Sequence, residues 1–177
     1  ANANKLLARF LLKVAQKYEF YLCDISGGSL HNAIPRDASA VFAVQNSDKE
    51  SVRVDFNIFA AEVQDEFSAT EPDMRFTLQS TDPVKRVIDP VVAKNLLCSL
   101  HAVFNGVFAM SQDVPGLVET SSNLASVKRM NENVILVTTS QRSSIESARD
   151  NVSSAVRTAF ELGGATVTTK GQYPGWK

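Results

Sequence analysis

Arg142 is the residue whose type and position point most directly to a binding chemistry. It follows the strand-like run Thr138-Thr139-Ser140 and directly precedes Ser143, where a helix is predicted to begin. A cation beside the positive end of a helix dipole is slightly unfavourable, so an Arg here gains from an anionic partner. A planar guanidinium binds a carboxylate through two parallel N–H groups. Arg142 is therefore a candidate carboxylate-binding residue, and the alternative is a solvated Arg at a helix start.

Asn32 is the second candidate. It lies in a connection between Gly27-Gly28 and Pro35, and its amide could donate to a ligand beside an arginine. The commoner role of a loop Asn is to satisfy nearby backbone groups in a turn. Asn123 takes roughly the same place in a second predicted hairpin, and we expect it to contribute to substrate binding or closure.

Metal and nucleophile motifs are missing from the sequence. The two histidines, His31 and His101, stand seventy positions apart, and there is no HxD, HExxH or CxxC spacing. No Gly-x-Ser-x-Gly elbow or phosphate-binding glycine loop occurs. Cys23 and Cys98 each lie in an apolar run, which is typical of buried, unreactive thiols in a reducing compartment. We expect neither a metal site nor a catalytic residue in this chain.

Composition excludes several classes of partner. The chain has 177 residues, 44% of them hydrophobic and 21% charged, with a net charge of −1, which is typical of one globular domain. No block of Lys and Arg is present, and the aromatic run Tyr18-Glu19-Phe20-Tyr21 has no basic neighbours, so we expect no nucleic-acid partner. No apolar stretch approaches the roughly 20 residues that span a bilayer, so we expect no membrane partner.

Periodicity and turn signals predict the elements that must position these residues. A helix is expected over 4–16, and another after the cap Asp89-Pro90. Two more should begin at Ser47 and at Ser143, each with a capping box that ends at a glutamate, Glu50 or Glu146. Strands are expected over 18–25, 38–44, 74–78 and 165–169, with a loop over 106–116 and a hairpin formed by 117–128 and 134–139. Gly163-Gly164 should end the last helix.

This order predicts an α+β fold of two layers, a mostly antiparallel sheet with about four helices on one face. The pattern of helix, strand, strand, helix and strand occurs twice. We therefore expect two ferredoxin-like halves, 1–80 and 89–171, produced by internal duplication, although helix and strand also alternate by chance. Residues 172–177 are expected to begin a linker, and the missing initiator Met suggests a chain cut from a longer protein.

Five stretches resemble the lid domain of the aminoacyl-histidine dipeptidases, a branch of the dinuclear zinc exopeptidases of the aminoacylase/carboxypeptidase type. They are Ala1-Asn2-Ala3-Asn4-Lys5-Leu6-Leu7, Asn32-Ala33-Ile34-Pro35-Arg36, Gly116-Leu117-Val118-Glu119-Thr120-Ser121-Ser122-Asn123-Leu124, Ser140-Gln141-Arg142-Ser143-Ser144 and Tyr173-Pro174-Gly175-Trp176. They follow one another in the family's order along the whole chain.

The resemblance implies a function for the parent protein. It would be a cytoplasmic dipeptidase that hydrolyses Xaa-His and other short peptides with two zinc ions, whose ligands and general base lie outside this chain. The chain would be a lid that closes over the dipeptide, with Arg142 pairing with the substrate carboxylate and Asn32 beside it. The family's oxyanion-stabilising histidine belongs to a Gly-Gly-His-Ser-Gly strand that this chain lacks, so His31 does not correspond to it.

The same resemblance implies the partners. They would be the chain's own catalytic domain, the dipeptide and a second subunit in a homodimer. A duplicated lid could cover the active site from its own chain, which would reduce the need for that second subunit. Alone, the chain should be inactive. The alternative function is a free-standing ferredoxin-like binding or assembly domain without enzymatic activity.

Overall fold

The computed structural model describes residues 1–30, 32–131 and 134–171. Its elements, in chain order, are α1 (Ala3–Lys17), β1 (Phe20–Gly27), β2 (Ala38–Val44), a short 3-10 helix (Asn46–Asp48), α2 (Lys49–Glu66), α3 (Pro90–Ala102), β3 (Gly106–Met110), β4 (Val118–Asn131), β5 (Val134–Ser143) and α4 (Glu146–Leu162). His31 and the stretch Tyr173-Pro174-Gly175-Trp176 lie outside the described residues, as does the expected linker 172–177.

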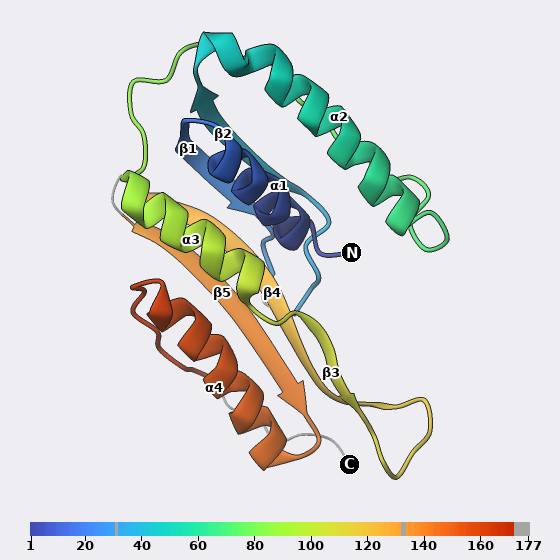
Figure 1. The fold of residues 1–177 in the computed structure, drawn as a ribbon. Helices are drawn as coiled ribbons and strands as arrows, with labels where there is room; N and C mark the ends of the chain where they lie inside the picture. Colours follow the sequence, from blue (N-terminus) through green and yellow to red (C-terminus); the bar gives the residue numbers. More distant parts are fainter. Residues whose placement is uncertain (31, 132–133, 172–177) are drawn as a thin grey trace.

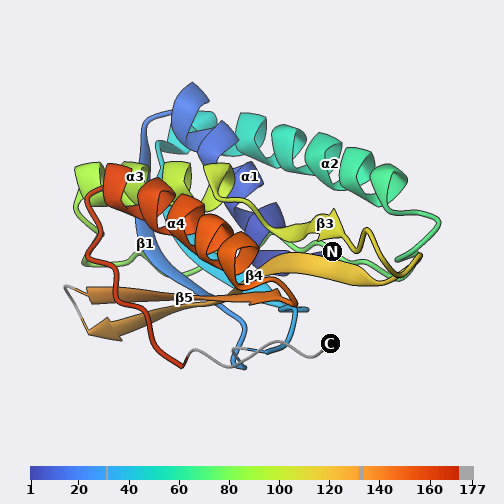
Figure 2. The ribbon, with the colours of Figure 1, turned by 90° about the horizontal axis from the view of Figure 1, so that it is seen from below.

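The predicted fold class is confirmed. Four helices lie side by side on one face of a five-stranded antiparallel sheet, in the order α2, α1, α3 and α4 (Figures 1 and 2). Buried side chains from the helices and the sheet meet in one core, which includes Leu11 of α1, Leu22 of β1, Leu97 of α3, Leu124 of β4 and Val152 of α4. In the described part of the chain, no helix is both long enough and apolar enough to cross a bilayer.

Two hairpins meet at the centre of the sheet. β1 pairs with β2, β4 pairs with β5, and β1 meets β4 in antiparallel orientation where Gly27 lies opposite Val127. Each hairpin follows one helix and precedes another. The two helix–hairpin–helix units therefore join through their first strands to make one continuous sheet.

Caps explain two of the helix starts. The Asn2 side chain accepts hydrogen bonds from the backbone N–H groups of Asn4 and Lys5 at the start of α1. Asp89 does the same for Val91 and Val92 at the start of α3, with Pro90 in the first turn, as the sequence predicted. Such a cap typically contributes about 1 kcal/mol.

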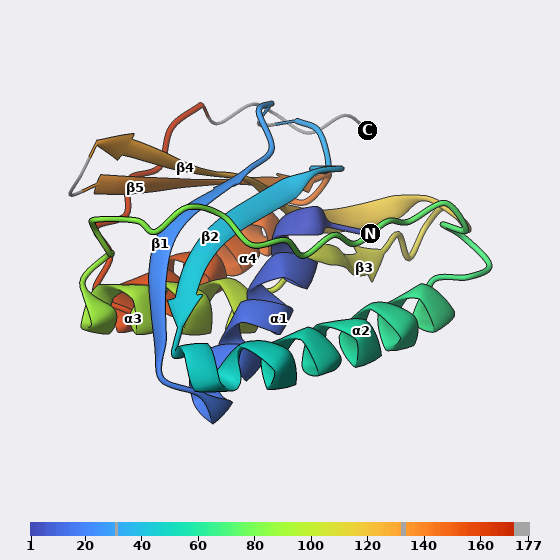
Figure 3. The same cartoon turned by 90° about the horizontal axis from the view of Figure 1, so that it is seen from above.

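Several local predictions were wrong. Residues 74–78 and 165–169 form no strand, because neither lies against a strand edge in paired register, although Phe76 and Val167 still pack against the core. Figure 3 shows the segment between α2 and α3 running back toward β1, where the Ile88 N–H donates to the Leu22 carbonyl over 2.7 Å. The expected loop 106–116 instead contains β3.

The helix starts after β2 and β5 also differ from expectation. A 3-10 turn precedes α2, whose N-cap is Asp48, and Ile145 is the N-cap of α4, so neither predicted capping box forms. Gly163 caps the end of α4 as expected.

Both cysteines were expected to be buried. Cys23 is buried, and its burial raises the pKa of its thiol. The prediction was wrong for Cys98, which is exposed because it lies on the outer side of α3.

Candidate functional site

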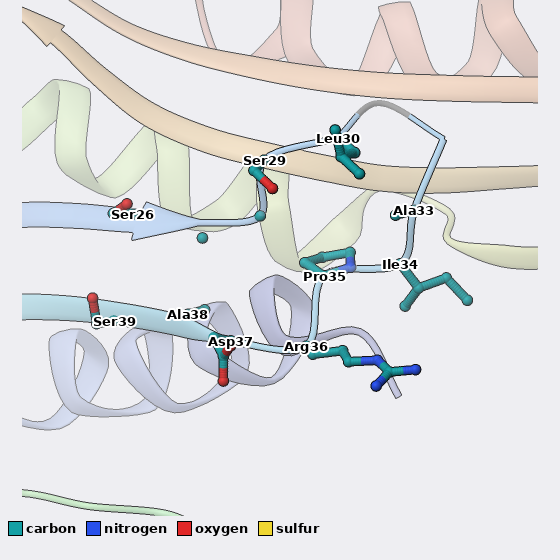
Figure 4. Close-up of a pocket in the computed structure, with 12 residues that line it drawn as sticks. Ser26, Ser29, Leu30, Ala33, Ile34, Pro35, Arg36, Asp37, Ala38 and Ser39 are labelled. Atoms are coloured by element: carbon teal, nitrogen blue, oxygen red, sulfur yellow. The ribbon is translucent and has the colours of Figure 1, made fainter.

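The connection between β1 and β2 forms a loop that carries Asn32 near its tip. Residues 26–30 and 33–39 line an open hollow inside it (Figure 4). Ile34 and Arg36 point away from this hollow, while Pro35 points inward and is buried. Asn32 itself is exposed.

Gly28 sets the direction in which the loop leaves the sheet. Its φ is +77°, in the left-handed region that favours glycine, and an added Cβ would lie 2.0 Å from the Ala125 carbonyl oxygen of β4. At its other end the loop is held by the Ala3 N–H, which donates to the Pro35 carbonyl over 3.0 Å. The loop is therefore fixed to β4 and to the start of α1.

The loop lies beside a break in the strand pairing of β4. β5 occupies one edge of β4, so β3 and β1 must share the other edge, where β3 pairs as far as Ser122 and β1 pairs at Val127. Between these two residues the described chain offers β4 no strand partner on that edge.

Two asparagine side chains fill this break. The Asn105 Oδ1 accepts from the Leu124 N–H over 2.8 Å, and the Asn2 Nδ2 donates to the Leu124 carbonyl over 2.9 Å. Each supplies the group that a neighbouring strand would have supplied. The two side chains are also joined, since the Asn2 Nδ2 donates to the Asn105 Oδ1 over 3.1 Å.

Asn123 connects this break to the loop. Its Nδ2 donates to the Ala33 carbonyl over 2.8 Å, and its Oδ1 accepts from the Asn2 Nδ2 over 3.4 Å. Ala33 is the neighbour of Asn32. The structure therefore brings Asn123 to the loop that carries Asn32, across 90 positions of sequence.

Arg142 lies near Asn123 on the neighbouring strand. The side chain of Gln141 is bonded to Ser122 and to Ser153 of α4, so Arg142, which is exposed, points to the opposite face of the sheet, the one without helices. Arg142 is paired with Ser121, and Asn123 with Ser140. Arg142 and Asn123 are thus diagonal neighbours on one face, a relation that typically separates Cα atoms by about 7–8 Å.

Lys5 ties the start of α1, and with it Asn2, to the next helix. Its Nζ donates to the carbonyls of Leu100, His101 and Val103 over 2.8, 2.8 and 2.6 Å. This cation satisfies carbonyls at the end of α3, where the helix dipole is negative. Burial lowers the pKa of Lys5 to about 8.

The described residues offer no site for a metal. No group of three or more His, Cys, Asp or Glu side chains comes together among them. His101 lies exposed in the last turn of α3. The residues present therefore do not fit a dinuclear zinc centre, and the expectation that such a centre lies elsewhere in the protein stays a prediction.

Asn2 and Asn105 were not among the residues that the sequence singled out. Asn is a common N-cap, and Asn2 lies only two positions before the predicted helix 4–16, so this signal could have identified it. The position of Asn105 against β4 depends on long-range pairing, for which its own surroundings in the sequence give no signal.

Comparison with known proteins supports the predicted relationship. Residues 1–71 match the family of peptidase dimerisation domains. The chain is 35% identical over 176 residues to the cytosol non-specific dipeptidase of Escherichia coli (strain K12), covering 99% of this chain and 36% of that protein. It matches the crystal structure of the aminoacylhistidine dipeptidase from Vibrio alginolyticus with a TM-score of 0.96 and 34% identity, covering 100% of this chain and 36% of that one.

The matched region spans 36% of the length of both relatives. The chain thus corresponds to one part of a larger type of protein. It is similar to these dipeptidases along its whole length, and its first 71 residues match the family of peptidase dimerisation domains.

Proposed function

We propose that this chain is the lid domain of a dipeptidase and that Arg142 and Asn32 bind the carboxylate of the dipeptide. The observation that carries the proposal is the placement of Arg142 and Asn123 on one face of the sheet, with Asn123 bonded to the loop that holds Asn32. A dipeptidase must recognise a free carboxylate and exclude longer peptides. A guanidinium with a neutral amide nearby suits that task.

The remainder of the protein would supply the chemistry. Two zinc ions would be held by residues outside this chain, where they would activate a water for attack on the peptide bond. The lid's own residues would bind and orient the substrate, and closure would exclude bulk water. One relative is a non-specific dipeptidase and the other an aminoacylhistidine dipeptidase, which supports a short peptide or an aminoacyl-histidine as substrate.

Location and partners follow the same relationship. The Escherichia coli relative is a cytosol dipeptidase, which supports a place in the cytosol for this protein as well. The family of the first 71 residues supports a homodimer, and the catalytic domain of the same protein would be the lid's second partner. We also retain 1–80 and 89–171 as the two halves of a duplicated lid, because each contains one helix–hairpin–helix unit.

Steady-state kinetics of the full-length protein test this function. Breaking a desolvated, charge-assisted contact typically costs about 2–5 kcal/mol. Arg142→Ala should therefore lower kcat/KM for a dipeptide by roughly 30-fold or more, because each ~1.4 kcal/mol is tenfold. Asn32→Ala should act in the same direction.

The matched control is Arg53→Ala, which removes an Arg on α2 whose Nε lies 3.9 Å from a carboxylate oxygen of Glu50. It should leave kcat/KM unchanged. Melting temperatures of all three variants should stay near that of the wild type, because the changed side chains lie outside the core. Activity near wild type for Arg142→Ala would exclude the proposed carboxylate site, and a full-length protein that cleaves no dipeptide would favour a non-enzymatic binding domain.

A further inference from the structure

We propose that Asn123 is a positioning residue that holds Asn32 in place and does not itself bind substrate. The proposal rests on the proposed function insofar as it gives Asn32 a role in binding. From the sequence, Asn123 could have contributed either to substrate binding or to closure of the lid. The proposal assigns it a positioning role instead.

The polar groups of Asn123 are already engaged within the protein. Its Nδ2 donates to the Ala33 carbonyl over 2.8 Å, a good distance for an N–H···O bond, and its Oδ1 makes a longer, weaker contact of 3.4 Å with the Asn2 Nδ2, whose two hydrogens also serve Asn105 and Leu124. The side chain is half-buried. The bond to Ala33 uses one of the two N–H groups of this amide and fixes the direction in which the amide points.

The other end of this contact is rigid. Asn2 is 6% exposed, caps α1 and donates to the Leu124 carbonyl of the central strand β4. Asn105 holds both Asn2 and the Leu124 N–H. Because these groups are part of a helix cap and of the sheet, Asn123 presents its amide to the loop from a fixed position.

Two hydrogen bonds hold the loop next to Asn32: the Asn123–Ala33 bond, and a longer one across the turn in which the Ala33 N–H donates to the Leu30 carbonyl over 3.3 Å. Leu30 and Ile34 are 60% and 63% exposed, so they contribute little packing on either side of Asn32. The contacts of Gly28 and Pro35 hold the two ends of the loop. The bond across the turn stays within the loop, whereas the Asn123–Ala33 bond ties the part of the loop next to Asn32 to β4.

This contact also relates the two candidate binding residues to each other. Asn32 comes from the first helix–hairpin–helix unit, and Arg142 comes from the second. Asn123 is a diagonal neighbour of Arg142 and is bonded to the residue after Asn32. It therefore sets the spacing between the amide and the guanidinium that must reach the same carboxylate.

Hydrogen–deuterium exchange of the full-length protein tests the positioning directly. Asn123→Leu keeps the approximate shape of the side chain and removes its hydrogen bonds. Exchange in peptides from residues 28–37 should become roughly tenfold faster, as expected for the loss of one typical hydrogen bond. Asn151→Leu, which changes an exposed Asn on α4, is the matched control and should leave this exchange unchanged. Asn123→Gln, which retains the amide, should give an intermediate rate.

Kinetics then test whether the effect acts through Asn32. Asn123→Leu should lower kcat/KM about tenfold, mainly by raising KM, in the otherwise wild-type protein. In an Asn32→Ala background it should cause little further loss. A full additional loss in that background would overturn the proposal in favour of direct substrate contact.

The two readouts separate this proposal from the proposed function. Unchanged exchange in the loop of Asn123→Leu overturns the positioning role, whatever the activity. Faster exchange, combined with no kinetic effect of Asn32→Ala, would support positioning of the loop and reject the substrate role of Asn32.

Discussion

Replacing Gly28 with Ala should destabilise the domain, because two structural features at this position act together. Gly28 has a φ of +77°, and a left-handed conformation costs a residue with a side chain about 1–2 kcal/mol. The new Cβ would also lie 2.0 Å from the Ala125 carbonyl oxygen. That oxygen belongs to the backbone of the central strand, so the clash can be relieved only by a shift of the loop or of β4. Overpacking of this kind typically costs about 1–3 kcal/mol.

The expected net loss for Gly28→Ala is about 2–4 kcal/mol, because the lower entropy of the unfolded chain returns about 0.4–1 kcal/mol. For a domain of this size, that corresponds to a fall of roughly 5–15 °C in Tm. Gly116→Ala is the matched control, since Gly116 has a φ of +82° but nothing within 4 Å of the added Cβ. It should lose only about 1 kcal/mol.

Thermal and urea unfolding of the 177-residue chain, followed by circular dichroism, would measure both changes. The comparison isolates the contact with Ala125, because the two glycines share their left-handed φ. Equal losses of stability in the two variants would refute the argument that the loop is seated tightly against β4.

Two further predictions concern Lys5 and metal. The pKa of Lys5 falls from the usual 10.5 to about 8 on folding. Between these pH values the unfolded chain therefore holds a proton on Lys5 that the folded chain has released. The contribution of Lys5 to the free energy of unfolding should accordingly rise with pH across that window. Denaturation of the wild type and of Lys5→Met from about pH 7 to about pH 11 should show curves that diverge over this window, and parallel curves would contradict the assignment. The 177-residue chain alone should bind no stoichiometric zinc and cleave no dipeptide, and metal analysis together with a peptidase assay that found both would reject this.

The sequence predicted those elements whose signals are local. α1 and α3 have apolar residues at helical spacing, α3 also has the cap Asp89-Pro90, and β2 has the predicted bounds Ala38–Val44. The predictions of strands at 74–78 and 165–169 were wrong. Alternation of apolar and polar residues identifies a segment with one apolar side, whereas a strand also needs a neighbouring strand with free backbone groups. β3 was missed because Gly106–Met110 is short and every residue after its glycine is apolar, so its sequence shows no alternation.

The candidate site was predictable to a similar extent. Residue type and resemblance identified Asn32, Asn123 and Arg142, and their roles stay predictions. The contacts of Asn2 and Asn105 with Leu124 could not be predicted, because they depend on the break between β3 and β1 along β4. That break results from the register of strands far apart in the sequence.

The pairing of Gly27 with Val127 has a consequence for the order of folding. Each hairpin joins strands that follow one another in the chain, whereas this contact closes a loop of about one hundred residues. The entropy of closing such a loop must be overcome before the contact stabilises anything, so long-range pairing tends to form late. We therefore expect each helix–hairpin–helix unit to gain structure first and the two to dock in a later, slower step. Until then Gly27, Gly28 and the asparagines around Leu124 would face water, so the surroundings of Asn32 would be among the last parts of the domain to form.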